Sequence, residues 1–485
     1  MSQSLIPGID PNAVTPVPFL GGWTTGEASS PVNAPYDGAL IGSVPALTAA
    51  DVDAAAAYAK EALHHHPLLQ WKRAEILDRA AERLAAHRET FARCIALEAA
   101  KPIRTARGEV DRAVSTFQFS AAVARTLTGE TVPLEAASAG EGKLGFVMRV
   151  PIGVVGAIAP FNFPLNLVVH KVGPAIAAGC PVVIKPASQT PFSTILLARM
   201  LLEECELPAG FLQVTTGGGS TVGNALVDNP DIALITFTGS PPVGWAIRSR
   251  APHKRVGLEL GNNAPVIIDA DGDWETAVAK IRLAGFAHAG QSCISTQRVL
   301  VHESLVQQVG AALSEAVATL VVGDPLDEAT EVSSLISTSE RDRVKSWIDE
   351  AVADGATVSC GGDIGADGVL RPTVIVDAKP EMNVCALEVF GPVVAVQGFT
   401  DFDEALRLAN DTRYGLQAGV FTRDIDKALR AVRTLDFGGV TVNEVPTWRA
   451  DQMPYGGLRD SGNTREGPAY SVREMTEERL VILNG

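Results

Sequence analysis

The sequence predicts an α/β protein with two parallel sheets in two large domains, and three observations lead to this fold class. The chain has 485 residues, which is too long for one ordinary hydrophobic core. Between residues 150 and 261 short apolar segments alternate with helical stretches, and a second alternating set follows. Apolar strands separated by helices are typical of a parallel sheet that is covered on both faces.

The first 125 residues are predicted to be mainly helical. Thr48 followed by Asp51 indicates a helix start, because such side chains bond to the free backbone N–H groups of a helix N-terminus. We expect a long helical region from about residue 71 to a stop at Lys101-Pro102, and another from about 109 to 125.

From residue 150 onward strands and helices are expected to alternate. The first set has predicted strands at 152–159, 181–185, 212–216, 233–239 and 256–260, with helices at 164–179, 192–204 and 241–249. The second set has predicted strands at 265–270, 297–303 and 371–377, with helices at 274–290, 304–321 and 402–411. The segment 475–483 is predicted to be a terminal strand, which would be prone to aggregation unless another subunit paired with it.

Charge and composition exclude several classes of function. The formal net charge of −16 argues against nucleic acid as the main partner, because phosphate binding needs a dense basic face. No secretory signal is visible at the N-terminus, and the most apolar stretches are short and broken by glycine and proline. We therefore expect no membrane association.

The cysteine and histidine patterns predict no metal site. The six cysteines are scattered without a CxxC pair, which fits reduced thiols in a cytoplasm and excludes a local zinc-finger spacing. Three consecutive histidines at 64–66 precede Pro67, and no second cluster of metal-binding residue types lies nearby in sequence. We interpret them as an exposed helix end.

Three features are compatible with a dinucleotide cofactor, although each has a simpler interpretation. The glycine-rich segment 215–223 departs from the GxGxxG spacing and could be a tight strand-to-helix turn. Ser240 and two prolines place a helix N-terminus directly after a strand, where free N–H groups can bind a pyrophosphate. Lys185 ends an apolar strand, the position at which ligands bind in open α/β sheets, but it could equally be solvated.

Three further residues are candidates for catalysis. Glu259 lies in an apolar run, so its carboxylate needs a partner or has a raised pKa, unless it occupies an exposed strand position. Asn162 lies in a rigid loop with prolines and could donate to an oxyanion or be an ordinary turn residue. Cys293, in GFAHAGQSCISTQR, is either a small buried hydrophobe or a nucleophile.

In their order along the chain these motifs resemble the aldehyde dehydrogenase superfamily. The matching motifs are Pro160-Phe161-Asn162, Lys185-Pro186, Phe237-Thr238-Gly239-Ser240, Glu259-Leu260-Gly261, Gly290-Gln291-Ser292-Cys293, Glu388-Val389-Phe390-Gly391-Pro392, and Pro454-Tyr455-Gly456-Gly457 with Ser461-Gly462. The resemblance covers nearly the whole chain. It implies that a Cys293 thiolate attacks an aldehyde and that Asn162 and the Cys293 backbone N–H stabilise the oxyanion. Glu259 would then activate the water that hydrolyses the thioester.

The resemblance also implies NAD or NADP as cofactor. The residues expected to bind it are Lys185, Ser188, Gly219, Gly239, Ser240, Glu388 and Phe390. Many NAD-preferring members carry a glutamate where this chain has Ser188. A carboxylate would repel a 2′-phosphate, whereas a serine can hydrogen-bond it, so Ser188 allows and favours NADP without excluding NAD.

By resemblance the substrate pocket is lined by Phe163, His170, Ser292, Ile294 and Tyr455, with Arg112 and Arg449 near its mouth. Two guanidinium groups at one mouth would attract a carboxylate or phosphate. Either could instead be a solvated charge, or be neutralised by Asp111 or Asp451. We therefore predict a small aldehyde, hydroxylated or anionic, with a broad aliphatic or aromatic range as the alternative.

The loop NEVPTWRADQMPYGG resembles that of members acting on lactaldehyde, glyceraldehyde 3-phosphate and phosphonoacetaldehyde. Phosphonate-specific members carry histidine and arginine at the positions of Phe163 and Ser292, which argues against a phosphonate. The chain also has Arg459 and Asn463 where lysine and glycine are frequent, with little expected effect on chemistry.

The resemblance divides the chain into a Rossmann-like NAD(P)-binding domain (1–125 and 151–259), an α/β catalytic domain (260–442) and a loop region for substrate and cofactor (443–464). A small β flap (126–150 with 465–485) would mediate dimers or tetramers.

A coenzyme-A-acylating dehydrogenase would need no general base, so Glu259 argues against it. A cysteine hydrolase could pair Cys293 with His170 or His288, but leaves Lys185 and Ser240 unexplained.

Overall fold

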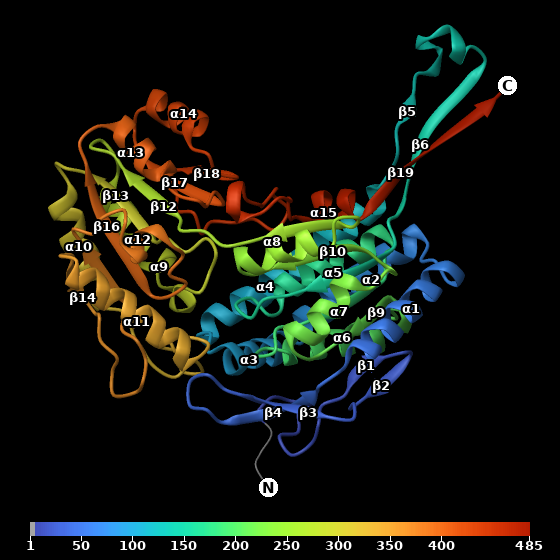
Figure 1. Ribbon diagram of the computed structural model, residues 1–485, viewed down its shortest axis with the longest axis horizontal. Coiled ribbons are helices and arrows are strands. Elements are labelled where there is room, and N and C mark those ends of the chain that lie inside the picture. The colour runs from blue at the N-terminus through green and yellow to red at the C-terminus, as the bar shows by residue number, and fades with distance from the viewer. Residues whose placement is uncertain (1–4) are drawn as a thin grey trace.

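Two predominantly parallel sheets form the body of the structure, a computed structural model that describes residues 5–485 (Figure 1). The first sheet has the strand order β11-β10-β7-β8-β9, and all neighbouring strands are parallel. Its strands are β7 (Val154–Ile158), β8 (Val182–Lys185), β9 (Leu212–Val214), β10 (Ile232–Thr238) and β11 (Arg255–Glu259). The predicted α/β class and these five strands are confirmed.

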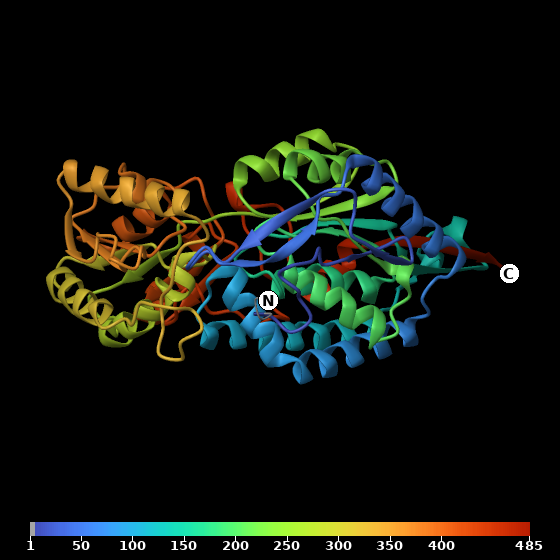
Figure 2. The same ribbon diagram turned by 90° about the horizontal axis from the view of Figure 1, so that it is seen from below.

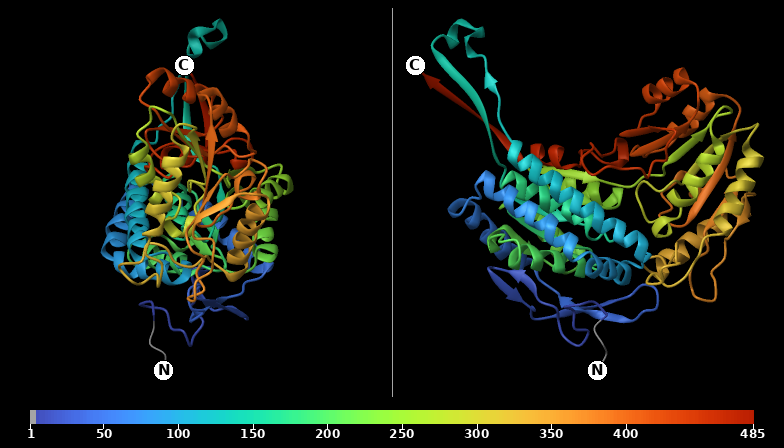
Figure 3. Two further views of the ribbon diagram at one scale, coloured as in Figure 1. Left: turned by 90° about the vertical axis from the view of Figure 1, so that its left-hand side faces the viewer. Right: turned by 180° about the vertical axis from the view of Figure 1, so that it is seen from behind.

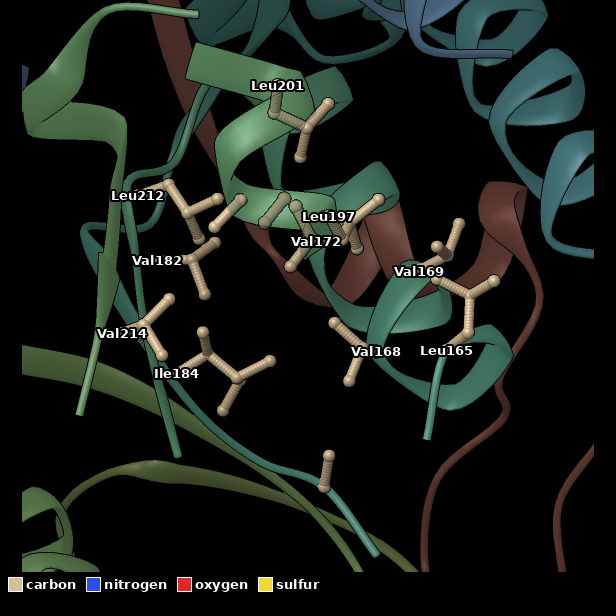
Figure 4. Packing of buried hydrophobic residues seen from close by; sticks show 14 of the residues in the cluster. Leu165, Val168, Val169, Val172, Val182, Ile184, Leu197, Leu201, Leu212 and Val214 are labelled. Carbon is tan, nitrogen blue, oxygen red and sulfur yellow. The ribbon is translucent and has the colours of Figure 1, made fainter. Parts of the chain in front are cut away.

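Helices cover both faces of the five-stranded sheet. Helices α5 (Asn166–Ala178) and α6 (Phe192–Glu203) pack on one face, and Figure 4 shows their apolar side chains directed toward those of β8 and β9. Helices α1 (Ala49–His65), α7 (Asn224–Asp228) and α8 (Pro241–Arg250) cover the other face (Figure 2). Burial of each valine or leucine between these layers contributes about 1.5–3 kcal/mol.

The N-terminal helices differ in part from the prediction. The expected capping at Thr48 and Asp51 is present at the start of α1. The predicted continuous helix from 71 to 101 is wrong, because the chain leaves helical geometry at His87 and forms two helices, α2 (Gln70–Ala86) and α3 (Arg88–Ala99). The next helix, α4 (Ile103–Thr126), begins earlier than expected and directly after Pro102, since proline is tolerated where a helix starts.

The second sheet has the strand order β14-β15-β16-β13-β12-β17-β18, with only β14 antiparallel to its neighbour. Its strands are β12 (Pro265–Ile268), β13 (Arg298–His302), β14 (Thr357–Cys360), β15 (Thr373–Val376), β16 (Val393–Phe399), β17 (Gln417–Phe421) and β18 (Gly439–Val442). Its helices are α9 (Trp274–Ala284), α10 (Val306–Ala318), α11 (Thr338–Ala353), α12 (Asn383–Ala386), α13 (Phe402–Asn410) and α14 (Ile425–Thr434).

A three-stranded antiparallel sheet projects from the body (Figure 1). It contains β5 (Thr131–Val132), β6 (Lys143–Pro151) and β19 (Thr476–Asn484), and β19 follows the short helix α15 (Pro468–Glu474). The predicted terminal strand is therefore present, but β19 pairs along its whole length with β6 of the same chain. At the opposite side of the molecule lie two N-terminal hairpins, β1 (Val17–Phe19) with β2 (Gly22–Thr24) and β3 (Ser29–Asn33) with β4 (Leu40–Pro45) (Figure 3).

A buried ion pair fixes the loop between β7 and α5. The Lys101 ammonium and the Glu109 carboxylate pair in the core, with side chains 0% and 1% exposed. The other Glu109 oxygen accepts hydrogen bonds from the backbone N–H groups of Leu165 (2.9 Å) and Asn166 (3.1 Å) at the start of α5. The ammonium also lies 3.7 Å from the centre of the Phe163 ring. The pair thus orients the segment that carries Asn162.

We predict that Glu109→Gln lowers the free energy of unfolding by about 3–5 kcal/mol, because Lys101 is left buried without an opposite charge. The glutamine oxygen can still accept from the Leu165 and Asn166 N–H groups, so the loss reports the charge. The measurement is the midpoint of urea unfolding. In the control, Lys101→Met/Glu109→Gln, both charges are absent and much of the stability should return; equal stability of Glu109→Gln and the wild type would contradict this account.

Candidate active site

The candidate active site lies where the carboxyl end of the five-stranded sheet meets the seven-stranded sheet. Glu259 is the last residue of β11, and Asn162 follows β7. The backbone N–H of Asn262 donates to the Glu388 carboxylate (2.9 Å) and so connects the end of β11 to the segment before β16. Ligands of open α/β sheets bind at these strand ends.

Cys293 lies between α9 and β13, just after a tight turn. His288, Ala289 and Gly290 all have positive φ angles, of 51°, 52° and 70°. A Cβ atom on Gly290 would lie 2.0 Å from the carbonyl oxygen of Gly391, so only glycine fits. This close approach brings the segment carrying Cys293 against the segment carrying Glu388 and Phe390.

The Cys293 thiol contacts a tyrosine in a mainly buried environment. Its Sγ lies 2.8 Å from the hydroxyl oxygen of Tyr455. The pKa of the thiol is raised to about 12, mainly by burial and also by the carboxyl groups of Glu388 and Glu259, although the Tyr455 hydrogen bond and the Arg449 charge lower it. The thiol is therefore neutral at pH 7 in this environment, and both carboxyl groups lie close enough to affect it.

Glu259 is 5% exposed, and neither of its carboxylate oxygens has a hydrogen-bond partner among residues 5–485. Burial raises the pKa of this carboxyl well above its usual range, and the nearby charge of Glu466 adds to the effect. Arg449 and Lys171 act in the opposite direction. A carboxyl group in this state is a stronger base when ionised than an exposed one.

Asn162 is buried and its side-chain amide donates to the backbone carbonyl of Gln291 (3.0 Å). The Gln291 side-chain oxygen in turn accepts from the backbone N–H of Ile336 (2.9 Å). Because Gln291 is two residues before Cys293, this contact holds Asn162 beside the segment that carries Cys293.

Both arginines expected at the pocket mouth are paired with carboxylates. Arg112 donates to Asp451 (2.8 Å), whereas Asp111 pairs with Arg88 (2.6 Å). Arg449 donates to Glu466 (2.7 Å), and its side chain is only 5% exposed. Its guanidinium group lies 3.7 Å from the centre of the Tyr455 ring.

His170 joins the two ion pairs. Its Nε2 lies 3.1 Å from Asp451 and 3.3 Å from Arg449, and its Nδ1 lies 4.0 Å from Glu466. Burial lowers the pKa of the imidazole although Glu466 opposes the shift. Although burial opposes it, the cations around Glu466 lower the pKa of that carboxyl to about 2.

Several polar atoms in this cluster are buried without a hydrogen-bond partner among the described residues. They are the Nε atoms of Arg112 and Arg449, the Nδ1 atom of His170 and both carboxylate oxygens of Glu259. An unsatisfied buried polar group costs about 1–3 kcal/mol, so such a group is a natural contact for a polar ligand.

Sequence reasoning did not identify Glu466 or Lys171. Lys171 is 1% exposed and donates to Thr238 (2.7 Å), with its ammonium 3.9 Å from Glu466. A lysine within the apolar helix NLVVHKVGPAIAA was a usable signal, because a buried ammonium group needs partners. Glu466 offered none, since its contacts come from distant parts of the chain.

Of the residues expected to bind a dinucleotide, Ser188 borders a cavity of about 200 Å³. Its lining residues also include Pro186, Ala187, Thr216, Gly217 and Gly218. Lys185 is buried, ends β8 and, among the described residues, donates to the carbonyl of Pro186 alone (3.0 Å), and burial lowers the pKa of its ammonium group. Ser188 is exposed and donates to the Gly217 carbonyl (3.1 Å).

The phosphate and nicotinamide sides also have the expected arrangement of groups. Ser240 precedes α8, which begins with Pro241 and Pro242, so Val243 carries the first N–H group of the helix, and Gly239 lies directly before Ser240. Gly219 has open space where a Cβ atom would lie, so a ligand can approach its backbone. Glu388 is half-buried, desolvation raises the pKa of its carboxyl to about 7, and Phe390 contacts Phe161 edge to face. These residues fit a dinucleotide.

The remaining predicted pocket residues fall in two places. Ile294 is buried in one cluster with Tyr455, beside Cys293. Phe163 lies between the Lys101 ammonium and the His288 ring. Ser292 instead borders a small cavity with Glu388 and Phe390, and so lies on the side of the predicted cofactor residues.

No helix in residues 5–485 combines the length and apolar character needed to cross a membrane. Residues 23–481 match the model of the aldehyde dehydrogenase family. The chain is 45% identical to 3-sulfolactaldehyde dehydrogenase of Priestia aryabhattai over 465 residues, 96% of this chain and 97% of that protein. It is 38% identical to lactaldehyde dehydrogenase of Methanococcus aeolicus over 472 residues, 96% of this chain and 99% of the relative.

A solved structure shows the same fold. The glyceraldehyde-3-phosphate dehydrogenase GapN of Methanocaldococcus jannaschii, crystallised with NADP, superposes with a TM-score of 0.90 at 35% identity. The match covers 95% of this chain and 100% of that one. The chain therefore belongs to the aldehyde dehydrogenase family and is an NAD(P)-dependent oxidoreductase that acts on aldehydes.

Proposed function

We propose that the protein oxidises small 2-hydroxyaldehydes to the corresponding acids, with Cys293 as nucleophile and Glu259 as general base. The observation that carries the proposal is the grouping of Cys293, Glu259 and Asn162 where the two sheets meet, with Glu259 close enough to affect the pKa of the thiol. A nucleophile, a base and an amide donor at one site are the groups that thioester chemistry needs.

In the proposed reaction Cys293 loses its thiol proton to solvent water, the thiolate sulfur forms a bond to the aldehyde carbon, and the carbonyl π electrons move to oxygen. The Asn162 amide and the Cys293 backbone N–H donate to this oxyanion. The predicted dinucleotide site would hold NAD or NADP, which would supply the hydride acceptor for oxidation of the Cys293 adduct to a thioester. The ionised Glu259 carboxylate then takes a proton from water, and the hydroxide releases the acid from Cys293.

The proposed cofactor site uses the cavity beside Ser188. Lys185 and Ser188 would hold the adenosine ribose, the start of α8 after Ser240 would hold the pyrophosphate, and Glu388 would hold the nicotinamide ribose. A serine in place of a carboxylate leaves room for a 2′-phosphate without charge repulsion. The proposal is therefore that NADP is accepted at least as well as NAD.

The substrate proposal rests on the relatives and on the polar cluster. 3-Sulfolactaldehyde, lactaldehyde and glyceraldehyde 3-phosphate, named for the three relatives, are all 2-hydroxyaldehydes. The Nε atom of Arg112 and the Nδ1 atom of His170 are buried and have no hydrogen-bond partner among the described residues. A substrate hydroxyl can accept a hydrogen bond from such nitrogens. A broad range of neutral aldehydes is the second candidate, because Asp451 and Glu466 already pair with both arginines.

Self-association through the projecting β sheet is part of the proposal. Leu144, Met148, Leu480, Ile482 and Leu483 are about half exposed on β6 and β19. Apolar side chains gathered on one projecting sheet favour contact with a second copy of the chain. A dimer or tetramer is therefore proposed.

The first prediction separates acylation from hydrolysis. Glu259→Gln should release a rapid burst of reduced cofactor about equal to the enzyme concentration, followed by a slow phase, because the thioester forms but is not hydrolysed. Stopped-flow absorbance at 340 nm measures both phases. The control Cys293→Ala should bind cofactor and show neither phase; turnover by that variant would end the proposal, and loss of the burst in folded Glu259→Gln would give Glu259 another role.

The second prediction concerns the aldehyde. Arg112→Met should lower kcat/KM about tenfold for lactaldehyde and about ten- to a hundredfold for glyceraldehyde 3-phosphate. The value for propanal should be unaffected, because propanal has no hydroxyl or phosphate group for Arg112 to bind. Initial rates with the three aldehydes measure this. The control Arg88→Met breaks the Arg88–Asp111 pair away from the site and should change none of them. Equal effects of Arg112→Met on all three substrates would favour the neutral range.

The third prediction concerns the cofactor. Ser188→Glu should reduce the ratio of kcat/KM for NADP to that for NAD about tenfold or more, since the new carboxylate would repel the 2′-phosphate. Ser188→Ala is the control, and removes only the hydroxyl, with a smaller expected change. A ratio unaltered by Ser188→Glu would mean that this side chain does not face the ribose.

A further inference from the structure

The Tyr455 hydroxyl is the one side-chain hydrogen-bond partner of Cys293 Sγ among residues 5–485, at 2.8 Å. Tyr455 is 3% exposed and lies 162 residues from Cys293 in sequence. Lining of the pocket alone would require an apolar or aromatic surface, which a phenylalanine would provide. The hydroxyl directed at the reacting sulfur therefore needs its own explanation.

Backbone and side-chain contacts fix the tyrosine ring. The N–H of Tyr455 donates to the carbonyl of Glu466 (2.9 Å), and the N–H of Glu466 donates to the carbonyl of Tyr455 (2.6 Å). The Arg449 guanidinium covers the ring at 3.7 Å and is itself bonded to the Glu466 carboxylate. Glu466 and Arg449 thus hold the tyrosine with its hydroxyl at the sulfur, so the side chain loses little rotamer freedom when the hydroxyl forms its hydrogen bond.

The hydroxyl is suited to donate to a thiolate. Burial raises the pKa of Tyr455 well above its usual range, so the phenol keeps its proton. A cation over the ring draws electron density from it and makes the O–H a better donor. A hydrogen bond to the charged form of an acid favours that form, so this contact favours the ionised sulfur over the neutral thiol.

We propose that Tyr455 donates a hydrogen bond to the Cys293 thiolate and raises the fraction of enzyme with an ionised nucleophile. The inference rests on the proposed role of Cys293. As the sulfur–carbon bond forms, negative charge moves from sulfur to the aldehyde oxygen. The Tyr455 contact then weakens while the contacts to the oxyanion strengthen.

The net effect on rate follows from two opposing changes. A thiol pKa lower by one unit gives about tenfold more thiolate at pH 7, because the thiol is almost entirely neutral there. The same change makes each thiolate about threefold less nucleophilic, given a Brønsted slope of about 0.4–0.5. Each unit by which the tyrosine hydroxyl lowers the thiol pKa therefore gives a net gain in rate of about threefold.

The test is the rate at which iodoacetamide alkylates Cys293, followed by mass spectrometry of the tryptic peptide 283–298, which contains no other cysteine. Tyr455→Phe keeps the ring under Arg449 and removes only the hydroxyl. Between pH 7 and 9 we expect alkylation about threefold slower than in the wild type, and kcat/KM lowered by a similar factor without a rise in KM. Alkylation of the partly exposed Cys360 in the same sample should be unchanged and reports intact folding.

The matched control is Tyr470→Phe. It removes the hydroxyl of a different tyrosine, which lies on α15 and makes no hydrogen bond to Cys293 among residues 5–485. It should alkylate like the wild type. The inference is overturned if Cys293 of Tyr455→Phe is alkylated as fast as Cys293 of the wild type while the alkylation rate of Cys360 is unchanged. Because this assay needs neither aldehyde nor cofactor, its outcome is independent of aldehyde oxidation by Cys293→Ala, which tests the proposed function.

Discussion

The buried ion pair between Arg449 and Glu466 is the interaction on which the rest of the candidate site depends. Both side chains are 5% exposed, and a charge buried this deeply costs several kcal/mol unless an opposite charge compensates it. The arginine covers the Tyr455 ring, and the glutamate pairs with the Tyr455 backbone. The position of the hydroxyl beside Cys293 therefore depends on this pair as much as on the fold.

The same pair shifts the pKa values of the two buried carboxyl groups in opposite directions. The cations around Glu466 lower its pKa to about 2, and its negative charge adds to the burial that raises the pKa of Glu259 well above its usual range. Like charges in one low-dielectric site push their pKa values apart, and such a division is how acid and base roles become distinct. Glu259 can therefore accept a proton strongly once it ionises, while Glu466 remains a fixed charge.

The sequence was sufficient for features that arise from local pattern. Continuous apolar runs bounded by glycine and proline predicted the strands of the first sheet, whereas the lone carboxylate in such a run left open whether Glu259 is buried or exposed, and the structure shows it buried. No glycine or proline marks the helix break at His87. The His87 imidazole contacts Glu204 (3.0 Å) at the end of α6, which is distant in sequence. Likewise the start of α5 is capped by Glu109, 56 residues before Leu165. Contacts of this range follow from the assembled core.

In the proposed function, the pairing of Arg112 with Asp451 would determine which substrates suit the pocket. His170 and Asn166 also contact Asp451, so the carboxylate is held in place and would repel an anionic group brought close to Arg112. A hydroxyl group avoids this repulsion, because it can donate to Asp451 and accept from the arginine at once. An anionic tail can be tolerated only farther along the mouth, where Arg112 remains 31% exposed. The 2-hydroxyl of a small aldehyde therefore satisfies the pair better than a charge at the same position.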